Sequence, residues 1–507
     1  MRILFIYPNK VMVTRVPSGI GYLSAHLKKE GHQVELFDTT FIKYGDVESD
    51  EEFREKSLQV KNPELDKYGL VKRESNLFYE LDKKIQGFNP DIIAVSVVDP
   101  NYKLGLEILR YSKEKYKNIL RIMGGIVPTV SPEEVINEDC VDMICIGEGE
   151  DAFCELCKRL ENRQNIEDLK NFWIKKDNKI YKNPIRNVKD INEILPPDLS
   201  IFDERHFIRP LGGKVYKMGT VMWTRGCVFR CKYCANSVFE KIYKEKGKFY
   251  RIKDTKLLIK ELEDAKEKYK FEFFFFVDDL FPLHEPKIIE EFCKLYKEKI
   301  NLPFSINLQP TLVREEELKK VIDVGCVNVC IGLESGSNKI RREILGRDYK
   351  NENVIKAFNF ARKNKIRSSS FNMIGLPHET REDIFETIEL NKQANPTSAT
   401  VTFFHPYRGL ELRDLCLREK LFNPAEENVY RGESCLSSPL ISRQELSGIF
   451  KTFQLYLKLP KDYYDLIKIA EGDTEIAKEV YSKILKPKFD EVTKDEAIWD
   501  FSRKKDR

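Results

Sequence analysis

The chain has 507 residues, more than one hydrophobic core usually serves, so we expect two or three domains. Hydrophobic residues make up 41% of the chain and charged residues 33%, which excludes a disordered or fibrous protein. The 86 basic and 82 acidic residues leave a net charge of +4, so no nucleic-acid partner is expected.

The N-terminal apolar run, residues 2–7, is too short for a signal peptide, and no run approaches the roughly 18 apolar residues needed to span a bilayer. Twelve cysteines in a chain without an export signal are typical of reduced thiols, which bind metals more often than they form disulfides. We therefore expect a cytoplasmic protein without a transmembrane segment, in which the spacing of the cysteines is informative.

Residues 1–160 alternate strand-like and helix-like segments. A helix is predicted from about Ile20 to Glu30, where Gly31 ends it, and the charged stretch 41–77 has no clean period and is interpreted as an insertion. The predicted strands are Arg2–Tyr7, Gln33–Asp38, Asp91–Val98, Arg121–Met123 and Met143–Ile146. Their alternation with helices predicts an α/β domain with a doubly wound parallel sheet.

Small residues follow three of these strands. Ser96 lies at the end of the third, Gly124-Gly125 at the end of the fourth, and Gly147-Glu148-Gly149 after the fifth. Ligands of such sheets bind at the carboxyl ends of the strands, where glycine lets the backbone approach them closely. A single glycine pair could simply form a tight turn, but three such sites on one edge favour a ligand.

Residues 161–218 are interpreted as a linker, because polar turns and the run Leu195-Pro196-Pro197-Asp198 resist helix formation. A second domain is predicted at residues 219–412, with six strands, each followed by a helix. These strands are Val221–Trp223, Phe271–Val277, Phe304–Leu308, Val327–Leu333, Ser368–Ile374 and Ala399–Phe404. This series predicts a partial (β/α)6 barrel of the TIM type, in which the phenylalanines 273–276 are core.

A C-terminal helical region is predicted at residues 413–507. Leu446–Leu459 has the pattern of an amphipathic helix, and the charged tail 502–507 is predicted to be disordered.

Three cysteines follow the first predicted barrel strand. Cys227, Cys231 and Cys234 form a C-x3-C-x2-C triplet on a loop that can wrap around an iron-sulfur cubane. Three thiolates leave one iron open, whereas an electron-transfer cluster normally takes four protein ligands. The alternatives are a structural zinc site or an incidental cluster. Zinc normally takes a fourth Cys or His nearby, and the nearest histidine, His206, precedes the loop by many residues.

The triplet resembles the signature of the radical S-adenosylmethionine (SAM) superfamily. This resemblance implies a 4Fe–4S cluster whose fourth iron binds the methionine amine and carboxylate of SAM, with Tyr233 in the cofactor-binding loop. The segment containing Asp278-Asp279 is similar to the family's carboxylate motif, which meets the methionine ammonium by a charge-assisted hydrogen bond. One of the two aspartates could instead cap a turn.

Later motifs extend the resemblance over most of the chain. Glu334 lies in a segment similar to the one that meets the ribose hydroxyls, and Gly375 and Pro377 lie in one similar to the motif along the adenine. His378 stands where many members have glycine, so the motif does not predict the conformation of this loop. Residues 405–410 are similar to a closing proline-glycine turn.

Residues 1–160 are similar to a Rossmann-like cobalamin-binding domain that precedes the barrel in one radical SAM subfamily. The matching segments are 19–23, 124–129, 146–150 and 195–198. The resemblance implies cobalamin contacts at Ser96, Gly124, Gly125, Gly147 and Glu148. The Asp-x-His-x-x-Gly element is missing, because Asn9, Lys10 and Val11 follow the first strand, so cobalamin would bind without a protein histidine. The alternative is a vestigial or interaction domain.

The remaining cysteines and histidines carry weaker signals. The pairs Cys154/Cys157 and Cys326/Cys330 are interpreted as buried small apolar residues, with a second metal cluster as the alternative. His26 and His32 are interpreted as surface or hydrogen-bonded residues. His405 is a weak candidate for the substrate site, because it follows the last barrel strand.

The resemblance implies an enzyme that reductively cleaves SAM to a 5′-deoxyadenosyl radical, and we expect a cobalamin-dependent methyltransferase acting on an unactivated carbon. A cobalamin-linked cyclase, rearranging or oxidative enzyme is the alternative. A methylthiotransferase would need three further cluster cysteines near the N-terminus, and residues 1–130 contain none. A non-enzymatic binding module is disfavoured by the full set of motifs. The expected partners are a small-molecule, lipid or peptide substrate and a low-potential donor such as flavodoxin or ferredoxin. No catalytic residue is assigned.

Overall fold

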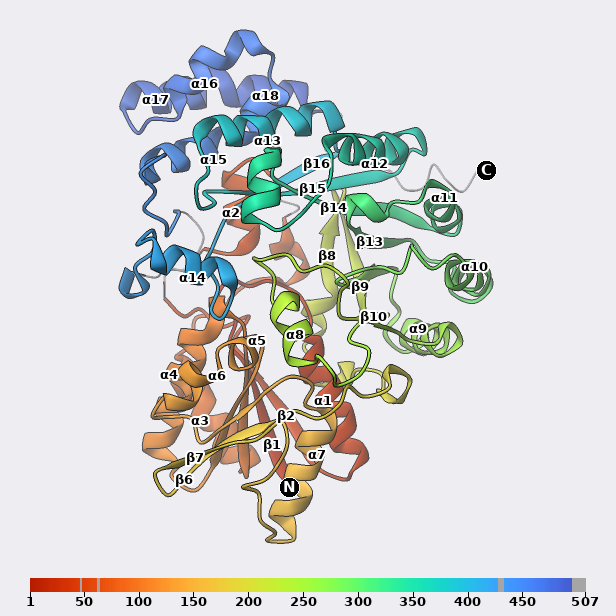
Figure 1. The fold of residues 1–507 in the computed structure, drawn as a ribbon, viewed down its shortest axis with the longest axis vertical. Coiled ribbons are helices and arrows are strands. Elements are labelled where there is room, and N and C mark those ends of the chain that lie inside the picture. The colour runs from red at the N-terminus through yellow and green to blue at the C-terminus, as the bar shows by residue number, and fades with distance from the viewer. Residues whose placement is uncertain (46–47, 62–63, 427–432, 495–507) are drawn as a thin grey trace.

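The computed structural model describes the chain except residues 46–47, 62–63, 427–432 and 495–507. The predicted disordered tail, 502–507, lies outside the described residues. A lower lobe contains the first sheet, an upper lobe contains a second, curled sheet, and helices of the C-terminal region cover the top of the second lobe (Figure 1). The protein is therefore a two-lobed α/β molecule with a helical C-terminal region, as the sequence predicts.

The first sheet has seven strands in the order β2-β1-β3-β4-β5-β6-β7. The strands are β1 (Arg2–Tyr7), β2 (Gln33–Asp38), β3 (Ile92–Val97), β4 (Leu120–Gly125), β5 (Met143–Cys145), β6 (Phe172–Lys176) and β7 (Lys179–Lys182). The first five are parallel, and the order changes direction between β1 and β3. This arrangement confirms the predicted doubly wound sheet, whose ligand crevice lies beside that change of direction.

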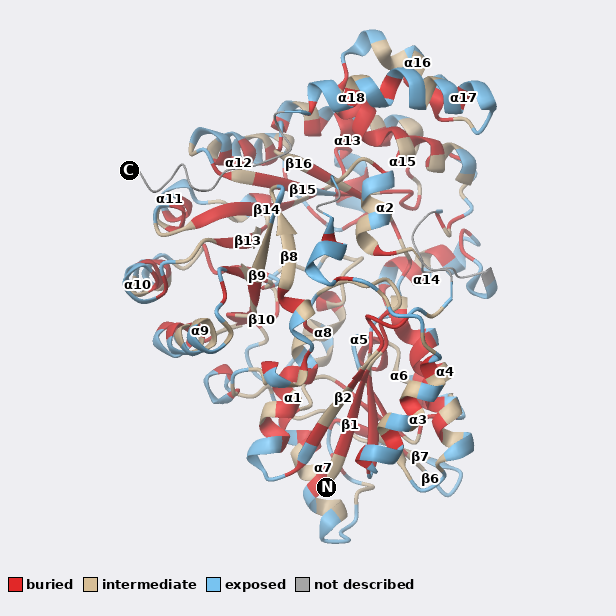
Figure 2. Cartoon of the chain, turned by 180° about the vertical axis from the view of Figure 1, so that it is seen from behind, coloured by how far each residue is buried: buried red, intermediate tan, exposed pale blue. Residues whose placement is uncertain are grey.

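The helices of this lobe lie on both faces of the sheet (Figure 1). They are α1 (Ser18–Lys29), α3 (Leu77–Phe88), α4 (Asp99–Lys115), α5 (Ile126–Val130), α6 (Pro132–Asn137) and α7 (Glu150–Glu161). The central strands are buried from both sides, as Figure 2 shows in red. Burial on both faces explains why the strands are continuous apolar runs rather than alternating ones.

The stretch predicted as polar connecting turns contains a hairpin that extends the first sheet. Strands β6 and β7 are antiparallel, and Asp177 and Asn178 join them with φ of 50° and 60°. Two residues of positive φ form the kind of turn that matches the twist of paired strands. The first sheet thus continues beyond residue 160.

The predicted insertion 41–77 contains a helix, α2 (Asp50–Lys56), that begins with a capping box of Ser49 and Glu52. Beyond it, the Gln59 side chain donates to the carbonyl of Val401 and accepts from its amide, each at 3.0 Å. The insertion thereby contacts the edge strand of the second sheet and satisfies both backbone groups of one of its residues, Val401.

The second sheet has the order β16-β15-β14-β13-β12-β9-β8. The strands are β8 (Ile208–Leu211), β9 (Lys214–Val221), β12 (Phe273–Phe276), β13 (Phe304–Leu308), β14 (Cys326–Glu334), β15 (Arg367–Ile374) and β16 (Ser398–Phe403). All are parallel except β8, which forms a hairpin with β9. This is the predicted partial barrel with one added strand. The first barrel strand is β9, so the prediction of Val221–Trp223 was placed too late.

Helices alternate with the barrel strands and cover the outer face (Figure 1). They are α9 (Thr255–Tyr269), α10 (Pro286–Leu295), α11 (Glu315–Asp323), α12 (Asn351–Lys363) and α13 (Arg381–Ala394). Helix α8 (Asn236–Ile242), which follows the cysteines, lies instead on the side of the first lobe and contacts α5. The C-terminal region comprises α14 (Glu411–Arg418), α15 (Arg443–Lys458), α16 (Tyr464–Ala470), α17 (Glu475–Glu479) and α18 (Lys486–Val492). None of the described helices is long and apolar enough to cross a membrane.

One apolar core connects the two lobes. It includes Phe5 and Phe153 of the first lobe and Phe274 of the barrel, with Phe202 and Phe207 between them in sequence. The ring of Phe207 packs edge-on against Phe271, which precedes β12, at 5.2 Å between centroids. The predicted core strand of phenylalanines is buried as expected, apart from the partly exposed Phe275.

Candidate active site

The three cysteines lie on the loop after β10 (Thr224–Arg225), a short strand paired with β11 (Arg251–Ile252). Gly226 begins the loop with φ of 84°, and an added Cβ would lie 2.7 Å from a backbone oxygen. Only glycine fits there without strain. The amide of Cys234 donates to the carbonyl of Cys231 at 3.0 Å, which closes the loop on itself. All three thiols remain partly exposed.

The three thiols have the chemistry expected of cluster ligands. Burial raises the pKa of Cys227 and Cys234 to about 11, and the charges of Asp279 and Cys231 act in the same direction. Such thiols stay protonated at neutral pH until a metal replaces the proton. Within the described ranges no three His, Cys, Asp or Glu side chains converge on one metal ion.

The two aspartates after β12 have different surroundings. Asp278 is 2% exposed, and its Oδ1 accepts the amides of Trp223 at 2.7 Å and Thr224 at 2.5 Å. Asp278 therefore holds the turn that leads to the cysteine loop. Burial raises the pKa of Asp278 to about 7. Asp279 is exposed, and its charge reaches Cys227 and Cys234, so Asp279 is the carboxylate open to a ligand.

Glu334 is tied to the cysteine loop at the carboxyl end of β14. Its Oε1 accepts from the hydroxyl of Tyr233 at 3.1 Å and from the guanidinium of Arg347 at 3.0 Å. Arg347 also donates to the Tyr233 hydroxyl at 2.8 Å. Burial raises the pKa of Glu334, and Arg347 and Tyr233 oppose that rise. The structure thus brings two predicted residues together through Arg347, which sequence reasoning missed.

The loop after β15 is organised by a second residue that the sequence analysis did not single out. Glu379 is fully buried, and its Oε2 accepts the amides of Gly375 at 2.6 Å and Leu376 at 3.1 Å. Gly375 has φ of 75° and Pro377 is buried. His378 has φ of 62°, so it keeps the left-handed conformation that glycine takes easily. The loop therefore tolerates the departure at His378.

Glu379 should make stability depend on pH. Burial raises the pKa of Glu379 from 4.5 to about 8. Between these values the folded protein keeps a proton that the unfolded chain has released, so stability falls as pH rises through that window. Glu379→Gln keeps an oxygen for the two amides and does not titrate. At pH 8 the free energy of unfolding of Glu379→Gln should exceed that of the wild type by up to about 4 kcal/mol.

Chemical denaturation between pH 5 and pH 8.5 measures this effect. The matched control is Glu389→Gln, an exposed glutamate on the adjacent α13. The stability of the Glu389→Gln control should fall as the pH rises, as the stability of the wild type does. Equal pH slopes in the wild type and Glu379→Gln would show that Glu379 is not the titrating group.

Ser96, Gly124 and Gly125 form an open shelf at the carboxyl edge of the first sheet. Ser96 pairs with Gly124 in the register of β3 and β4, beside the change of strand direction. Gly125 has φ of 98°, and an added Cβ would lie 2.6 Å from a backbone oxygen. Val98 and Ile126 flank the shelf and are 39% and 40% exposed. Small residues between exposed apolar side chains suit a flat, largely apolar ring system.

No histidine is available where the first strand ends. Asn9 occupies that position, is buried, and donates to Thr40 Oγ1 and to the carbonyl of Val13, each at 3.0 Å. The side chain of Asn9 is therefore structural. A corrinoid on this edge would have no imidazole ligand from that loop.

Gly147 and Glu148 lie against the barrel rather than on the open shelf. The amide of Glu148 donates to the hydroxyl of Tyr243 at 2.7 Å, and its carboxylate pairs with Arg251 and Arg225. A Cβ on Gly147 would lie 2.2 Å from the Tyr243 hydroxyl. These two residues join the lobes, which places the edge of the first sheet beside the strand that leads into the cysteine loop.

The other predicted candidates are accounted for by local structure. His26 and His32 are both buried, and His26 Nδ1 lies 2.9 Å from the carbonyl of Tyr22. His405 is half-buried and lies 3.4 Å from the sulfur of Cys435. Cys157, Cys326 and Cys330 are buried free thiols, and Cys154 is partly buried.

Two family models match parts of this chain. The model of the radical SAM superfamily matches residues 221–390, and the model of the B12-binding domain matches residues 71–157. The cysteine loop lies in the first match, and the glycine shelf lies in the second. Together with the fold, these matches define a two-domain radical SAM enzyme, which carries a radical SAM domain at residues 221–390 and a B12-binding domain ahead of the barrel. Such a chain takes a 4Fe–4S cluster, SAM and cobalamin.

Relatives of this chain include an uncharacterized methyltransferase of Pyrococcus horikoshii, 25% identical over 83% of this chain and 84% of the relative. An anaerobic magnesium-protoporphyrin IX monomethyl ester cyclase of Rubrivivax gelatinosus is 24% identical over 80% of this chain and 68% of the relative. The solved radical SAM methyltransferase TsrM from Kitasatospora setae has a TM-score of 0.60 and 15% identity, covering 91% of this chain and 86% of that chain. The likeness to TsrM concerns the fold.

Proposed function

We propose that this enzyme is a cobalamin-dependent methyltransferase that acts on an unactivated carbon of a small molecule, lipid or peptide. The observation that carries the proposal is the contact between the two cofactor edges. Arg225, two residues before Cys227, pairs with Glu150 at 2.6 Å, and Arg408 after β16 pairs with Asp99 at the start of α4. A methyl donor on the first sheet and a radical source on the barrel would then face each other. The methyltransferase relatives support this choice.

The described side chains would bind and orient the cofactors. The three cysteines would ligate three irons and leave the fourth to SAM. Asp279 would receive the methionine ammonium, and Glu334 would receive the ribose hydroxyls. When bound, the cofactors supply one-electron cleavage of SAM and a transferable methyl group. The buried contacts beneath them would exclude water from that chemistry.

A second candidate keeps the radical start without methyl transfer. The relative from Rubrivivax gelatinosus, named as a cyclase, favours it. The two candidates differ in stoichiometry. Methyl transfer should consume two SAM molecules per turnover and yield one S-adenosylhomocysteine and one 5′-deoxyadenosine, whereas the cyclase should yield no S-adenosylhomocysteine.

Anaerobic reconstitution, reduction and product quantification would test the proposal. The substrates offered should include tetrapyrroles, lipids and peptides. Equal amounts of S-adenosylhomocysteine and 5′-deoxyadenosine would support methyl transfer. 5′-Deoxyadenosine alone would favour the second candidate, and neither product would count against both.

The reaction needs a low-potential electron donor, and a flavodoxin or ferredoxin would suit it. A reducing compartment such as the cytoplasm would also suit the chain, whose twelve cysteines are all free thiols.

A further inference from the structure

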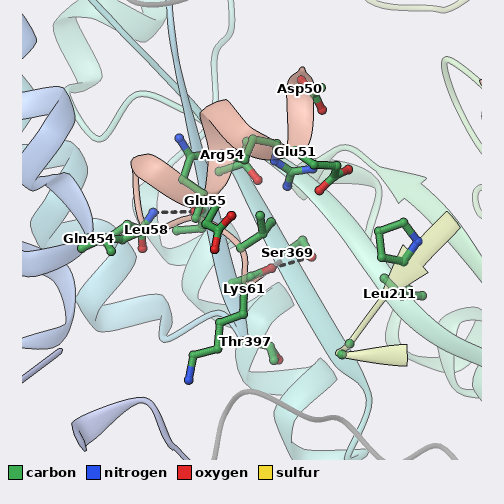
Figure 3. Close-up of a pocket in the computed structure, with 18 of the residues that line it drawn as sticks. Asp50, Glu51, Arg54, Glu55, Leu58, Lys61, Leu211, Ser369, Thr397 and Gln454 are labelled. Atoms are coloured by element: carbon green, nitrogen blue, oxygen red, sulfur yellow. Dashed lines mark hydrogen bonds between the residues drawn. The ribbon is translucent and has the colours of Figure 1, made fainter. Parts of the chain in front are cut away.

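A large cavity lies at the end of the barrel opposite the cysteine loop. Its volume is about 970 Å³, within the range of ligand pockets. Its lining includes Arg367 and Ser398, the first residues of β15 and β16, whereas Glu334 and Gly375 lie at the other ends of their strands. Figure 3 shows α2 lying over the barrel strands at this cavity, with Arg54 among its side chains. The insertion 41–77 therefore forms one wall.

Four arginines from four different segments line this cavity. Arg15 precedes α1, Arg54 lies on α2, Arg209 lies on β8, and Arg367 begins β15. Arg15, Arg54 and Arg209 lie within electrostatic reach of one another. Burial lowers the pKa of Arg209 to about 9, and the charge of Arg15 lowers it further. Burial also lowers the pKa of Arg15, and the charge of Arg54 lowers it further. The thiol of Cys330 on β14 interacts electrostatically with both Arg15 and Arg367.

Among the described residues, no carboxylate forms an ion pair with Arg15 or Arg209. The lining contains eight basic and four acidic side chains. Glu51 opposes the lowered pKa of Arg15 and Arg209. The Nη1 of Arg209 is buried without a hydrogen-bond partner.

The floor of the cavity has a further polar atom without a partner. Asn328 on β14 is 1% exposed, and its amide nitrogen donates to Ser305 Oγ at 2.7 Å, but its Oδ1 has no partner within the described residues. A buried unpaired oxygen costs free energy unless a ligand or water donates to it. Beside it, the ring of Phe275 lies under the guanidinium of Arg209 at 4.7 Å. Within the described residues, the cavity thus combines an arginine nitrogen without a partner, an amide oxygen without a partner, and an aromatic wall.

We propose that this cavity binds an organic ligand through an oxyanion group, phosphate or carboxylate, held by Arg15, Arg54, Arg209 and Arg367. Guanidinium groups bind such anions by paired, charge-assisted hydrogen bonds, and an anion would neutralise the crowded positive charge. A hydroxyl or amide of the same ligand would donate to Asn328, and its apolar part would contact Phe275.

The distance to the cofactor end limits the shape of this ligand if it is also the substrate, a reading that rests on the proposed function. Cys330 and Glu334 are four residues apart on β14. At about 3.3 Å per residue they are separated by about 13 Å along the strand. A substrate would then be elongated, with its oxyanion at the amino end of the barrel and its reacting carbon near SAM.

Direct binding tests the site without turnover. The full-length, cluster-reconstituted protein is titrated calorimetrically with sn-glycerol 3-phosphate and, separately, with succinate. Saturable binding is expected for at least one probe, and it should weaken as salt is added. Arg209→Gln and Arg54→Gln should each weaken binding by about tenfold or more. Arg209→Lys keeps the charge and should bind between the wild type and Arg209→Gln.

Arg362→Gln is the matched control, because Arg362 is exposed on α12 and does not line the cavity. It should bind both probes as the wild type does. Thermal melts check that each variant is folded. Binding of glycerol 3-phosphate alone would identify a phosphate site, and binding of succinate alone a carboxylate site. No saturable binding of either probe, or wild-type binding by both glutamine variants, would overturn the proposal. Because no SAM cleavage is measured, a negative result leaves the proposed function standing.

Discussion

Cys231→Ala should leave a folded protein that holds no stable cluster and forms no 5′-deoxyadenosine. Cys231 is the middle ligand of the triplet. Without it, only two thiolates would remain, too few to hold a cubane stably. Iron content should fall from about four atoms per chain toward zero. SAM cleavage should fall below detection. Iron and sulfide analysis, with absorbance near 400 nm, measures the loss.

Cys154→Ala provides the control. Cys154 is a partly buried free thiol on α7, outside the cysteine loop. This variant should keep its full iron content, which also tests the alternative of a second cluster near Cys157. A Cys231→Ala protein that still binds cluster and cleaves SAM would remove the basis of the assigned cofactor site.

Arg347→Leu should both destabilise the protein and weaken SAM binding. The side chains of Arg347 and Glu334 are 8% and 13% exposed, so removing the guanidinium leaves a carboxylate buried without its cation. Such a change typically costs about 3–5 kcal/mol of unfolding free energy. The pKa of Glu334 would rise further, and a protonated carboxyl is a weaker acceptor for hydroxyl groups. SAM affinity should fall by about tenfold or more.

Two further variants separate stability from binding. Arg342→Leu removes an exposed arginine five positions earlier and should change neither property. The double variant Arg347→Leu/Glu334→Leu removes both charges and should recover stability without recovering SAM binding. Denaturant midpoints and equilibrium dialysis against labelled SAM measure the two effects. A double variant that binds SAM normally would exclude Glu334 as a cofactor ligand.

The sequence predicted the architecture because parallel strands buried on both faces leave uninterrupted apolar runs. Such a run located β1, Arg2–Tyr7, at its observed bounds. The β6–β7 hairpin was missed because its strands are rich in lysine, although Asp177-Asn178 is a recognisable turn signal. The strand β9 begins earlier than predicted because its first four residues pair with β8 and none of them is fully buried, so a search for buried runs overlooks them.

The residues of the candidate site also fall into two groups, those that a local sequence pattern identified and those that only the fold brings together. Residues in contiguous motifs, such as Cys227 and Glu334, were identified because chemistry and spacing coincide there. Arg347 and Glu379 were not, because each acts through partners brought to it by the fold. The difference between Asp278 and Asp279 also required the structure, since identical side chains in adjacent positions face opposite surroundings. The arginine cluster assembles from segments up to about 350 positions apart, which no local pattern could indicate.

The continuous apolar core between the lobes holds them in one fixed arrangement, so the enzyme is preorganised rather than closed by a hinge motion. A hinge motion would expose the apolar surfaces around Phe202 and Phe207, and each 100 Å² of apolar area so exposed would cost about 2.5 kcal/mol. Every 1.4 kcal/mol lowers a population about tenfold, so separation of the lobes is disfavoured at equilibrium. The separation between the edge of the first sheet and the cysteine loop is therefore set when the chain folds.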